Sequence, residues 1–335
     1  QCMKLALDSL DDLADYLPED VAKEFNYPNL MKAFSDIHQP PDLDSAANAR
    51  ERLTFDEALL LQLLLGQRRN EIVKLVTKSR TPNTPVLVAA FEAKLPFKYT
   101  AGQIEVNTQI EKDLSNKYPM HRLLQGEVGS GKTVVALRAM LSVVDSSGQA
   151  ALLAPTEVLA QQHFRTIKKL LGELAQAGTL QAGSIGTEVE LLTGSLSNAE
   201  KKEIHAKLAS GQTGIVIGTH ALISDGVTFA DLGLVVVDEQ HRFGVEQRDA
   251  LRMKAKQPPH LLVMTATPIP RTVAMTVFGD LDISTLKELP SGRVAITTHI
   301  IPVLQKPHFL SRAWDRVKEE VAKGHQVYIV APRII

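Results

Sequence analysis

The fold of this chain is decided by the stretch Gly126-Glu127-Val128-Gly129-Ser130-Gly131-Lys132-Thr133. It matches the pattern Gly-x-x-x-x-Gly-Lys-[Ser/Thr] at every fixed position. The short, mostly apolar segment 122–125 before it can form a buried strand, and residues 134–140 after it favour a helix with alanine and leucine on the buried side. Strand, glycine-rich turn and helix, in that order, are the context in which this pattern binds phosphate.

The chemistry of this stretch is anion binding. Glycines let backbone N–H groups converge on phosphate oxygens, and the N-terminus of the following helix adds a partial positive charge. We expect Lys132 to contact the β- and γ-phosphates and Thr133 to ligate Mg²⁺. The alternative is a glycine-rich turn that binds nothing, which the Lys-Thr pair and the helix behind it disfavour. The residues predicted to contact a nucleoside triphosphate are Gly126, Glu127, Val128, Gly129, Ser130, Gly131, Lys132 and Thr133.

A second chemical element follows a buried strand later in the chain. The apolar run 234–237 leads directly into Asp238-Glu239-Gln240-His241. We expect Asp238 to hold Mg²⁺, directly or through water, and Glu239 to orient or deprotonate the attacking water. Acidic residues at a strand end can also be ordinary turn residues, but their place after a phosphate loop in an α/β pattern favours chemistry. The predicted catalytic residues are therefore Lys132, Asp238 and Glu239.

From residue 121 onward the sequence alternates between strands and helices. Compact, partly β-branched apolar runs predict strands at 150–154, 189–192, 215–217, 234–237 and 261–264. Helical patterns cover 156–171, 197–209 and 245–254, the second with the capping box Ser197-x-x-Glu200, while residues 172–187 predict a loop. The alternation predicts an α/β fold with a parallel sheet flanked by helices and with ligands at the carboxyl ends of the strands.

The first 90 residues have helical patterns and no recognisable chemistry. Asn29 is a candidate cap for a helix over 30–37, and the capping-box pattern at 54–57 predicts the start of a longer helix, whose broad leucine stripe indicates packing on a large surface. After residue 290 a second α/β unit is expected, with strands at 295–301 and 326–330 and a helix at 309–322. We expect a helical linker at 1–90, an α/β domain at 91–290 and the start of a second α/β domain at 291–335.

Composition and charge exclude several classes of protein. The 335 residues are 44% hydrophobic and 22% charged, and they contain no run that predicts a membrane span. The single cysteine, Cys2, excludes an internal disulfide, and together with the acidic N-terminus, which does not resemble a signal peptide, it favours a cytoplasmic location. Net charge is −6 over residues 1–50, +3 over 51–100 and +2 over 101–335. Because phosphate contacts need a basic face, any path for nucleic acid must be local and lie after the acidic start.

Six segments, taken in order, resemble the motifs of superfamily 2 helicases. They are residues 95–103, 154–163, 192–195, 218–220, 238–244 and 264–272. The Gln240 variant of the acidic box and its continuation Arg242-Phe243-Gly244 resemble the branch of this superfamily that remodels branched DNA. Translocases of the transcription-repair coupling type, the nearest alternative, have glutamate at the position of Gln240.

The resemblance implies further site residues. It implies a RecA-like lobe that uses ATP and Mg²⁺, with Phe97 and Gln103 at the adenine; the glutamine amide both donates and accepts, as adenine N6 and N7 require. It also implies DNA contacts by Pro155, Thr156, Gly194, Thr219 and His220. Coupling of the ATP state to DNA movement is implied for His241, Thr265 and Thr267.

The resemblance also implies partners and missing parts. We expect an ATP-driven motor lobe acting on branched or forked DNA in repair and recombination, with single-stranded DNA-binding protein as a further candidate partner. Such helicases carry a second motor lobe with arginine fingers and a wedge domain, neither of which the sequence matches, so we expect a fragment of a longer protein. The remaining alternatives are a nucleotide-binding module that does not hydrolyse ATP and a small-molecule kinase, but residues 265–267 have no role in a kinase.

Overall fold

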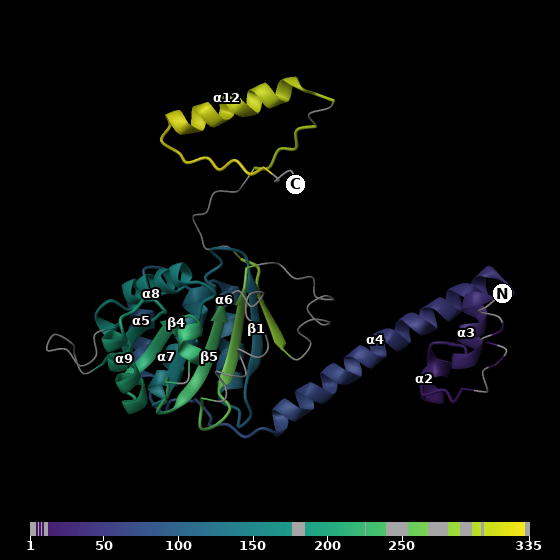
Figure 1. Ribbon diagram of the computed structural model, residues 1–335, viewed down its shortest axis with the longest axis horizontal. Coiled ribbons are helices and arrows are strands. Elements are labelled where there is room, and N and C mark those ends of the chain that lie inside the picture. The colour runs from purple at the N-terminus through teal and green to yellow at the C-terminus, as the bar shows by residue number, and fades with distance from the viewer. Residues whose placement is uncertain are drawn as a thin grey trace. The chain divides into compact units, whose positions relative to one another are not determined.

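The computed structural model describes residues 5, 7, 9, 13–175, 185–224, 226–238, 254–266, 281–288, 297–302 and 305–331. The chain divides into two compact units, Gln1–Pro290 and Ser291–Ile335, which are considered separately. Figure 1 labels the helices and strands β1, β4 and β5. The second unit starts where the third region was expected; the roles assigned to the three regions remain predictions.

The first unit contains a seven-stranded sheet in the order β3-β4-β2-β5-β6-β1-β7. Its strands are β1 (His121–Gly126), β2 (Gln149–Leu153), β3 (Glu188–Leu192), β4 (Thr213–Gly218), β5 (Leu232–Asp238), β6 (His260–Thr265) and β7 (Asp282–Leu286). Every neighbouring pair is parallel. The predicted α/β fold with a parallel sheet is confirmed, and so are the strands expected from the apolar runs.

The central strands are buried on both faces, which explains their unbroken apolar sequences. Side chains alternate between two hydrophobic cores, as the period of a strand requires. On β5, Leu234 and Val236 join one core, whereas Val235 and Val237 join the other. Such strands can be recognised from sequence because water touches neither face.

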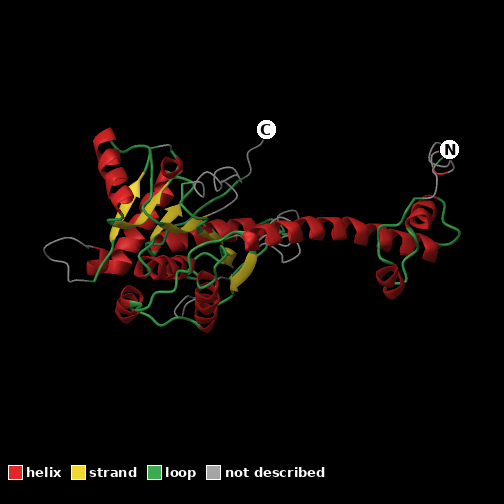
Figure 2. Ribbon diagram, turned by 90° about the horizontal axis from the view of Figure 1, so that it is seen from below, coloured by secondary structure: helices red, strands yellow, loops and turns green. Residues whose placement is uncertain are grey.

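Helices cover both faces of this sheet, as Figure 2 shows. They are α5 (Val86–Lys94), α6 (Ala101–Leu114), α7 (Lys132–Asp145), α8 (Glu157–Leu171) and α9 (Asn198–Ser210), with short 3₁₀ turns η1 (Gly172–Ala175) and η2 (His220–Ile223). The capping box predicted at Ser197 and Glu200 is confirmed, because the side chain of each residue accepts the backbone N–H of the other. Most of the loop expected at 172–187, and nearly all of the helix expected at 245–254, lie outside the described residues.

Strand β7 was not predicted, because it lies at the sheet edge and carries polar residues. Its Ser284 is buried in a polar cluster in which Arg122 of β1 donates to the Ser284 hydroxyl at 2.6 Å and the hydroxyl donates to Gln109 of α6 at 2.5 Å. Arg122 Nε also donates to Asp113 Oδ2 at 2.6 Å. A hydrogen-bonded cluster holds this strand, so hydrophobic periodicity gives no signal for it.

The N-terminal region is helical, as expected, but its long helix begins earlier than predicted. The elements are α2 (Glu19–Glu24), α3 (Leu30–His38) and α4 (Leu43–Lys74). Asn29 caps α3 by accepting from the Lys32 N–H at 2.8 Å, which confirms that prediction. The predicted start at Thr54 is wrong, because Asp42 caps α4 twelve residues upstream and Thr54 lies inside the helix.

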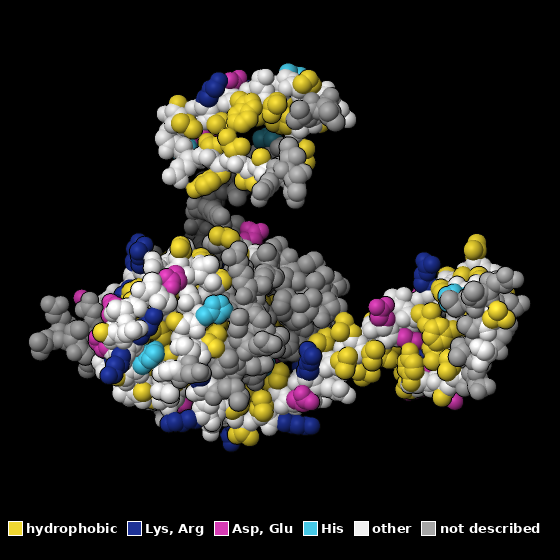
Figure 3. Space-filling view, viewed as in Figure 1, with side chains coloured by type: hydrophobic (Ala, Val, Ile, Leu, Met, Phe, Trp, Pro, Cys, Tyr) yellow, Lys and Arg dark blue, Asp and Glu magenta, His cyan; other side chains and the backbone are white. Residues whose placement is uncertain are grey.

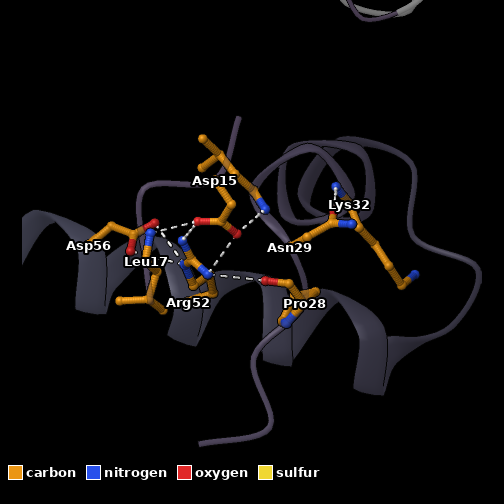
Figure 4. Close-up of polar contacts among 8 residues, drawn as sticks. Asp15, Leu17, Pro28, Asn29, Lys32, Arg52 and Asp56 are labelled. Carbon is orange, nitrogen blue, oxygen red and sulfur yellow. Dashed lines mark hydrogen bonds and ion pairs between the residues drawn. The ribbon is translucent and has the colours of Figure 1, made fainter. Parts of the chain in front are cut away.

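A buried arginine explains why the helix continues through that pattern. Arg52 is fully buried, and its Nε donates to both oxygens of Asp56, one turn further along α4, at 2.9 Å. Its Nη2 donates to Asp15 Oδ1 at 2.7 Å, and Nη1 reaches the carbonyl of Pro28 at 3.3 Å (Figure 4). Asp56 is therefore the i+4 partner of a buried cation rather than part of an N-terminal cap.

The leucine stripe of α4 is only partly covered. Leu65 is buried, whereas Leu60, Leu63 and Leu64 are each more than half exposed, at 63%, 57% and 51%. Figure 3 shows hydrophobic side chains on the surface along this helix. Within the described residues no large surface covers these three leucines, so the packing expected for this stripe is not found there. No described helix is both long and apolar enough to cross a membrane.

The segment after α4 is tied to the sheet by charge. Arg80, whose side chain is 3% exposed, pairs with Asp231 just before β5, with Nη1 donating to Oδ2 at 2.9 Å. Lys78 reaches the same Oδ2 at 3.0 Å. These cations lower the pKa of Asp231 to about 2, with the hydrogen bond from Arg80 as the largest favourable contribution.

The second unit contains helix α12 (His308–Ala322), close to the helix predicted at 309–322. The strands predicted at 295–301 and 326–330 are not formed in the described residues 297–301 and 326–330. A strand exists through its ladder of hydrogen bonds with a neighbour, so apolar, β-branched sequence alone does not produce one.

Candidate nucleotide and DNA site

The parallel sheet gathers the predicted motifs at one edge. Register pairs Leu153 with Val237, Asp238 with Met264 and Gln125 with Thr265, so the carboxyl ends of β2, β5, β6 and β1 lie level. The segments at the carboxyl ends of six strands lie side by side in the order β3, β4, β2, β5, β6 and β1. In that order they are residues 193–195, 219–220, 154–156, 238, 265–266 and 126–133. The predicted phosphate and metal residues lie at the ends of β1 and β5, the predicted coupling residue Thr265 ends β6, and the predicted DNA residues follow β3, β4 and β2.

The phosphate loop has the backbone that its glycines allow. Gly129 and Gly131 have φ of 85° and 89°, in the left-handed region that favours glycine. A Cβ on Gly126 would lie 2.5 Å from Ser130 Oγ and 3.1 Å from the Leu286 Cβ, so a larger residue would push the loop off β7. Helix α7 begins at Lys132, so the loop leads directly into a helix N-terminus.

The residues around this loop fit the phosphates and metal of a nucleotide. A cavity of about 390 Å³ is lined by Lys132, Thr133 and Asp238, together with Gly129 and Gly131, and lies in the size range of ligand pockets. The Lys132 amine donates to the loop's own carbonyls, Gly126 O at 2.7 Å and Glu127 O at 3.0 Å. These charge-assisted bonds keep a cation beside the N–H groups of the loop. Buried Ser130 Oγ has no hydrogen-bond partner among the described atoms, as expected of a group near an anion site.

An unpredicted histidine shares this cavity. His163 of α8 places Nε2 2.7 Å from Asp238 Oδ2, and both side chains are 13% exposed. The sequence marked residues 154–163 only through their resemblance to a DNA-contacting motif. Nothing in a helical pattern indicates that its seventh residue will meet a carboxylate at the end of β5.

Gln103 lies against the phosphate loop. Its Nε2 donates to the Ser130 carbonyl at 2.9 Å, and its Oε1 accepts from Thr100 N–H at 3.0 Å in a capping box that begins α6. A Cβ on Gly131 would lie 2.3 Å from this Nε2, so glycine allows the contact. This Thr-x-x-Gln pattern was not identified as a capping box from the sequence, although it has the required spacing. Phe97 lies nearby in sequence and is 44% exposed; contact of either residue with adenine remains a prediction.

The start of α6 has a second support that the sequence did not reveal. Glu288, two residues after β7, accepts the N–H of Gly102 at 3.1 Å. That bond, followed by one from the Thr100 side chain, lowers the pKa of the Glu288 carboxyl. Glu288 follows an edge strand that was itself missed, so sequence gave no means of placing it.

Predicted DNA residues meet around the start of α8. Thr156 caps this helix by accepting the N–H of Leu159 at 3.3 Å, directly after Pro155. The Glu157 carboxylate accepts the N–H of Ser195 at 3.1 Å and so joins the segment that contains Gly194.

The segment after β4 lies beside the one after β3. The N–H of Thr219 reaches the Leu192 carbonyl at 3.4 Å, and His220 is exposed. DNA binding by these residues remains a prediction.

Of the predicted catalytic residue Glu239 and the predicted coupling residues His241, Thr265 and Thr267, the structure describes only Thr265. Thr265 ends β6 and is buried, next to the phosphate loop's strand β1. Glu239, His241 and Thr267 lie outside the described residues. Among the described residues, no group of three or more His, Cys, Asp or Glu could hold a metal ion.

Comparison with known proteins assigns this chain to a family. A model described as DEAD/DEAH box helicase matches residues 100–276. ATP-dependent DNA helicase RecG of Mycobacterium leprae is 52% identical over 335 residues, which is 99% of this chain and 45% of the relative. RecG of Synechocystis sp. is 44% identical over 96% of this chain and 37% of that relative.

A solved structure matches nearly the full length of the chain. The structure of RecG bound to a three-way DNA junction has a TM-score of 0.81 and 36% identity, covering 99% of this chain and 43% of that one. The chain thus spans less than half the length of these relatives.

Proposed function

Because the chain belongs to the DEAD/DEAH box helicase family, we propose that it is the first motor lobe of an ATP-dependent DNA helicase of the RecG kind. One observation carries the proposal: Lys132, Thr133 and Asp238 line a single cavity, and the predicted DNA segments follow the other strands of the same sheet edge. Because both sets of residues lie at one edge of a packed sheet, a change at one set can be transmitted to the other through rigid elements.

The chain's own residues have defined tasks in this proposal. Lys132 exchanges its bonds to the loop carbonyls for phosphate oxygens, and the loop N–H groups and the α7 N-terminus share the negative charge. Thr133 and Asp238 would hold Mg²⁺, which when bound neutralises charge that develops on the transferred phosphoryl group. Glu239 orients the attacking water, and Gln103 holds the loop through its hydrogen bond to the Ser130 carbonyl.

The DNA substrate is proposed from the relatives. RecG proteins at 44–52% identity and the RecG structure with a three-way junction support branched or forked DNA as the substrate. We further propose a second motor lobe and a wedge domain in the same full-length protein, a cytoplasmic location and single-stranded DNA-binding protein as a candidate partner. His241, Thr265 and Thr267 would couple the ATP state to DNA movement.

Nucleotide binding is tested with a fluorescent ATP analogue. Lys132→Ala should abolish most of the affinity, since it removes a charge-assisted phosphate contact and the main counter-charge of the loop. Lys94→Ala is the matched control, because Lys94 pairs with Glu173 on the surface of α5 outside the cavity. Unchanged binding by Lys132→Ala would refute the site.

Hydrolysis is tested in the full-length enzyme. Glu239→Gln should keep ATP binding and remove DNA-stimulated hydrolysis, because the amide cannot accept a proton from water. Normal turnover by this variant would show that another group activates the water.

A further inference from the structure

His163 is a polar group at the nucleotide cavity that the proposed function does not use. Its Nε2 lies 2.7 Å from Asp238 Oδ2, and both residues line the cavity that also contains Lys132 and Thr133. The histidine comes from α8 and the aspartate from the end of β5, so two elements converge on one carboxylate.

The scaffold fixes the imidazole. On α8, Ala160 lies three residues before His163 and Ile167 four residues after it, and both are fully buried in the core. Residues at these spacings share a helix face, so packing of that face directs His163 toward the sheet. Thr156 caps the same helix two turns earlier, which fixes where α8 begins.

The contact has a consequence for metal binding. A carboxylate has two oxygens and about four acceptor positions, and the hydrogen bond engages Oδ2. It therefore restricts rotation of the Asp238 side chain while Oδ1 can accept a metal ion or a metal-bound water. Groups that hydrogen-bond to a metal ligand orient it, and their loss costs roughly 10–100-fold in metal affinity or activity.

We propose that His163 is a positioning residue that holds the Asp238 carboxylate in the orientation needed for Mg²⁺ with the bound nucleotide. This inference rests on the proposed nucleotide site and deepens it. The competing interpretation is that His163 only fills space between α8 and β5. The two differ in what a substitution does to metal dependence, as distinct from nucleotide binding without metal.

The experiment compares His163→Leu, His163→Gln and the unsubstituted chain. Fluorescent ADP is bound first in EDTA and then during a Mg²⁺ titration, and Mn²⁺ binding is followed by electron paramagnetic resonance. His163→Leu should keep its affinity for ADP in EDTA within roughly twofold, and should need about tenfold more Mg²⁺ or Mn²⁺ to reach half saturation. His163→Gln retains an N–H donor and should restore most of the loss. His205→Leu, on α9 outside the cavity, is the matched control.

Three results would overturn the proposal. One is a Mg²⁺ dependence in His163→Leu equal to that of the unsubstituted chain. Another is loss of ADP affinity in EDTA together with a lower melting temperature, since that is the result of a space-filling role. The third is failure of the unsubstituted chain to bind ADP in EDTA, which would overturn the proposed function as well and is seen before any metal is added.

Discussion

The side-chain amide of Gln103 connects the start of helix α6 to the phosphate loop. Its oxygen caps the first turn of α6, and its nitrogen binds the Ser130 carbonyl in the phosphate loop. The side chain is 2% exposed, so a change there leaves buried partners without hydrogen bonds. Loop position and helix start are therefore coupled at a single residue, next to the segment predicted to contact adenine.

Gln103→Ala should weaken binding of nucleotides in general and reduce the preference for ATP over GTP. Loss of the Ser130 contact loosens the loop, which affects both nucleotides, whereas loss of an amide that recognises adenine should cost ATP a further 1–3 kcal/mol, roughly. Affinities for fluorescent ATP and GTP analogues, measured by titration, separate the two effects. An equal loss for both nucleotides would show that Gln103 acts on the loop alone.

At the residue scale, the sequence identified the residues of the candidate site better than it identified which side chains contact one another. Lys132, Thr133 and Asp238 could be named because each belongs to a pattern with fixed spacing, and all three line one cavity. His163 could not, because its partner lies 75 residues away on another element. Arg52 was not identified as a buried cation either, since only the fold brings its second partner, Asp15, to it from 37 residues away.

At the scale of helices and strands, the strands that are buried on both faces were the ones that the sequence predicted correctly. β5 was recognised because it is apolar on both faces, whereas β7 was missed because its exposed edge and buried Ser284 break the pattern. The start of α4 was misplaced because a capping box at Thr54 satisfies the same sequence rule as a true start. Local rules cannot distinguish the two when a tertiary contact, here Arg52 with Asp15, holds the helix upstream of the pattern.

Helix α5 depends on a cap supplied by another helix. Pro85 precedes it and provides no side-chain cap, and Asp145 at the end of α7 accepts the N–H groups of Leu87 at 2.9 Å and Val88 at 3.0 Å. Because Leu87, Val88 and Phe91 of α5 are buried in the core shared with α7, this cap connects helix formation to packing.

Asp145→Ala should lower the free energy of unfolding by about 1–2 kcal/mol, the usual cost of removing a side-chain cap. Asp145→Asn keeps an acceptor oxygen and should lose less. Urea unfolding followed by far-ultraviolet circular dichroism measures both variants against the unsubstituted chain. Identical midpoints for Asp145→Ala and the unsubstituted chain would mean that solvent caps α5 equally well.

At the scale of the whole molecule, α8 connects the two halves of the sheet edge. Its cap, Thr156, belongs to the predicted DNA segments, and His163, seven residues later, contacts Asp238 in the nucleotide cavity. A rigid helix with its N-terminus at the predicted DNA segments and its seventh residue at Asp238 is a physical route by which nucleotide state could shift those segments. Glu157 extends that route to the segment after β3 through Ser195.

Burial is distributed unequally over the chain, and this predicts unequal local stability. Nine of the fourteen residues of α7 are buried, whereas none of the fifteen residues of α12 is. An isolated helix of that length is marginal in water, because helices gain most of their stability from packing an apolar face. Opening of α12 should therefore cost little free energy, while opening of α7 requires disruption of the core.

Native-state hydrogen exchange should show this difference directly. Amide protection in α12 should be at least roughly a hundredfold lower than in α7, the ratio given by a difference of about 3 kcal/mol in opening free energy. Helix α3, which packs on α4 beside the Arg52 cluster, should lie between them, because three of its nine residues are buried. Mass spectrometry of peptides from the three helices, with exchange measured at one pH, gives the order. Protection in α12 equal to that in α7 would show that the second unit gains stability from contacts other than burial of its own helix.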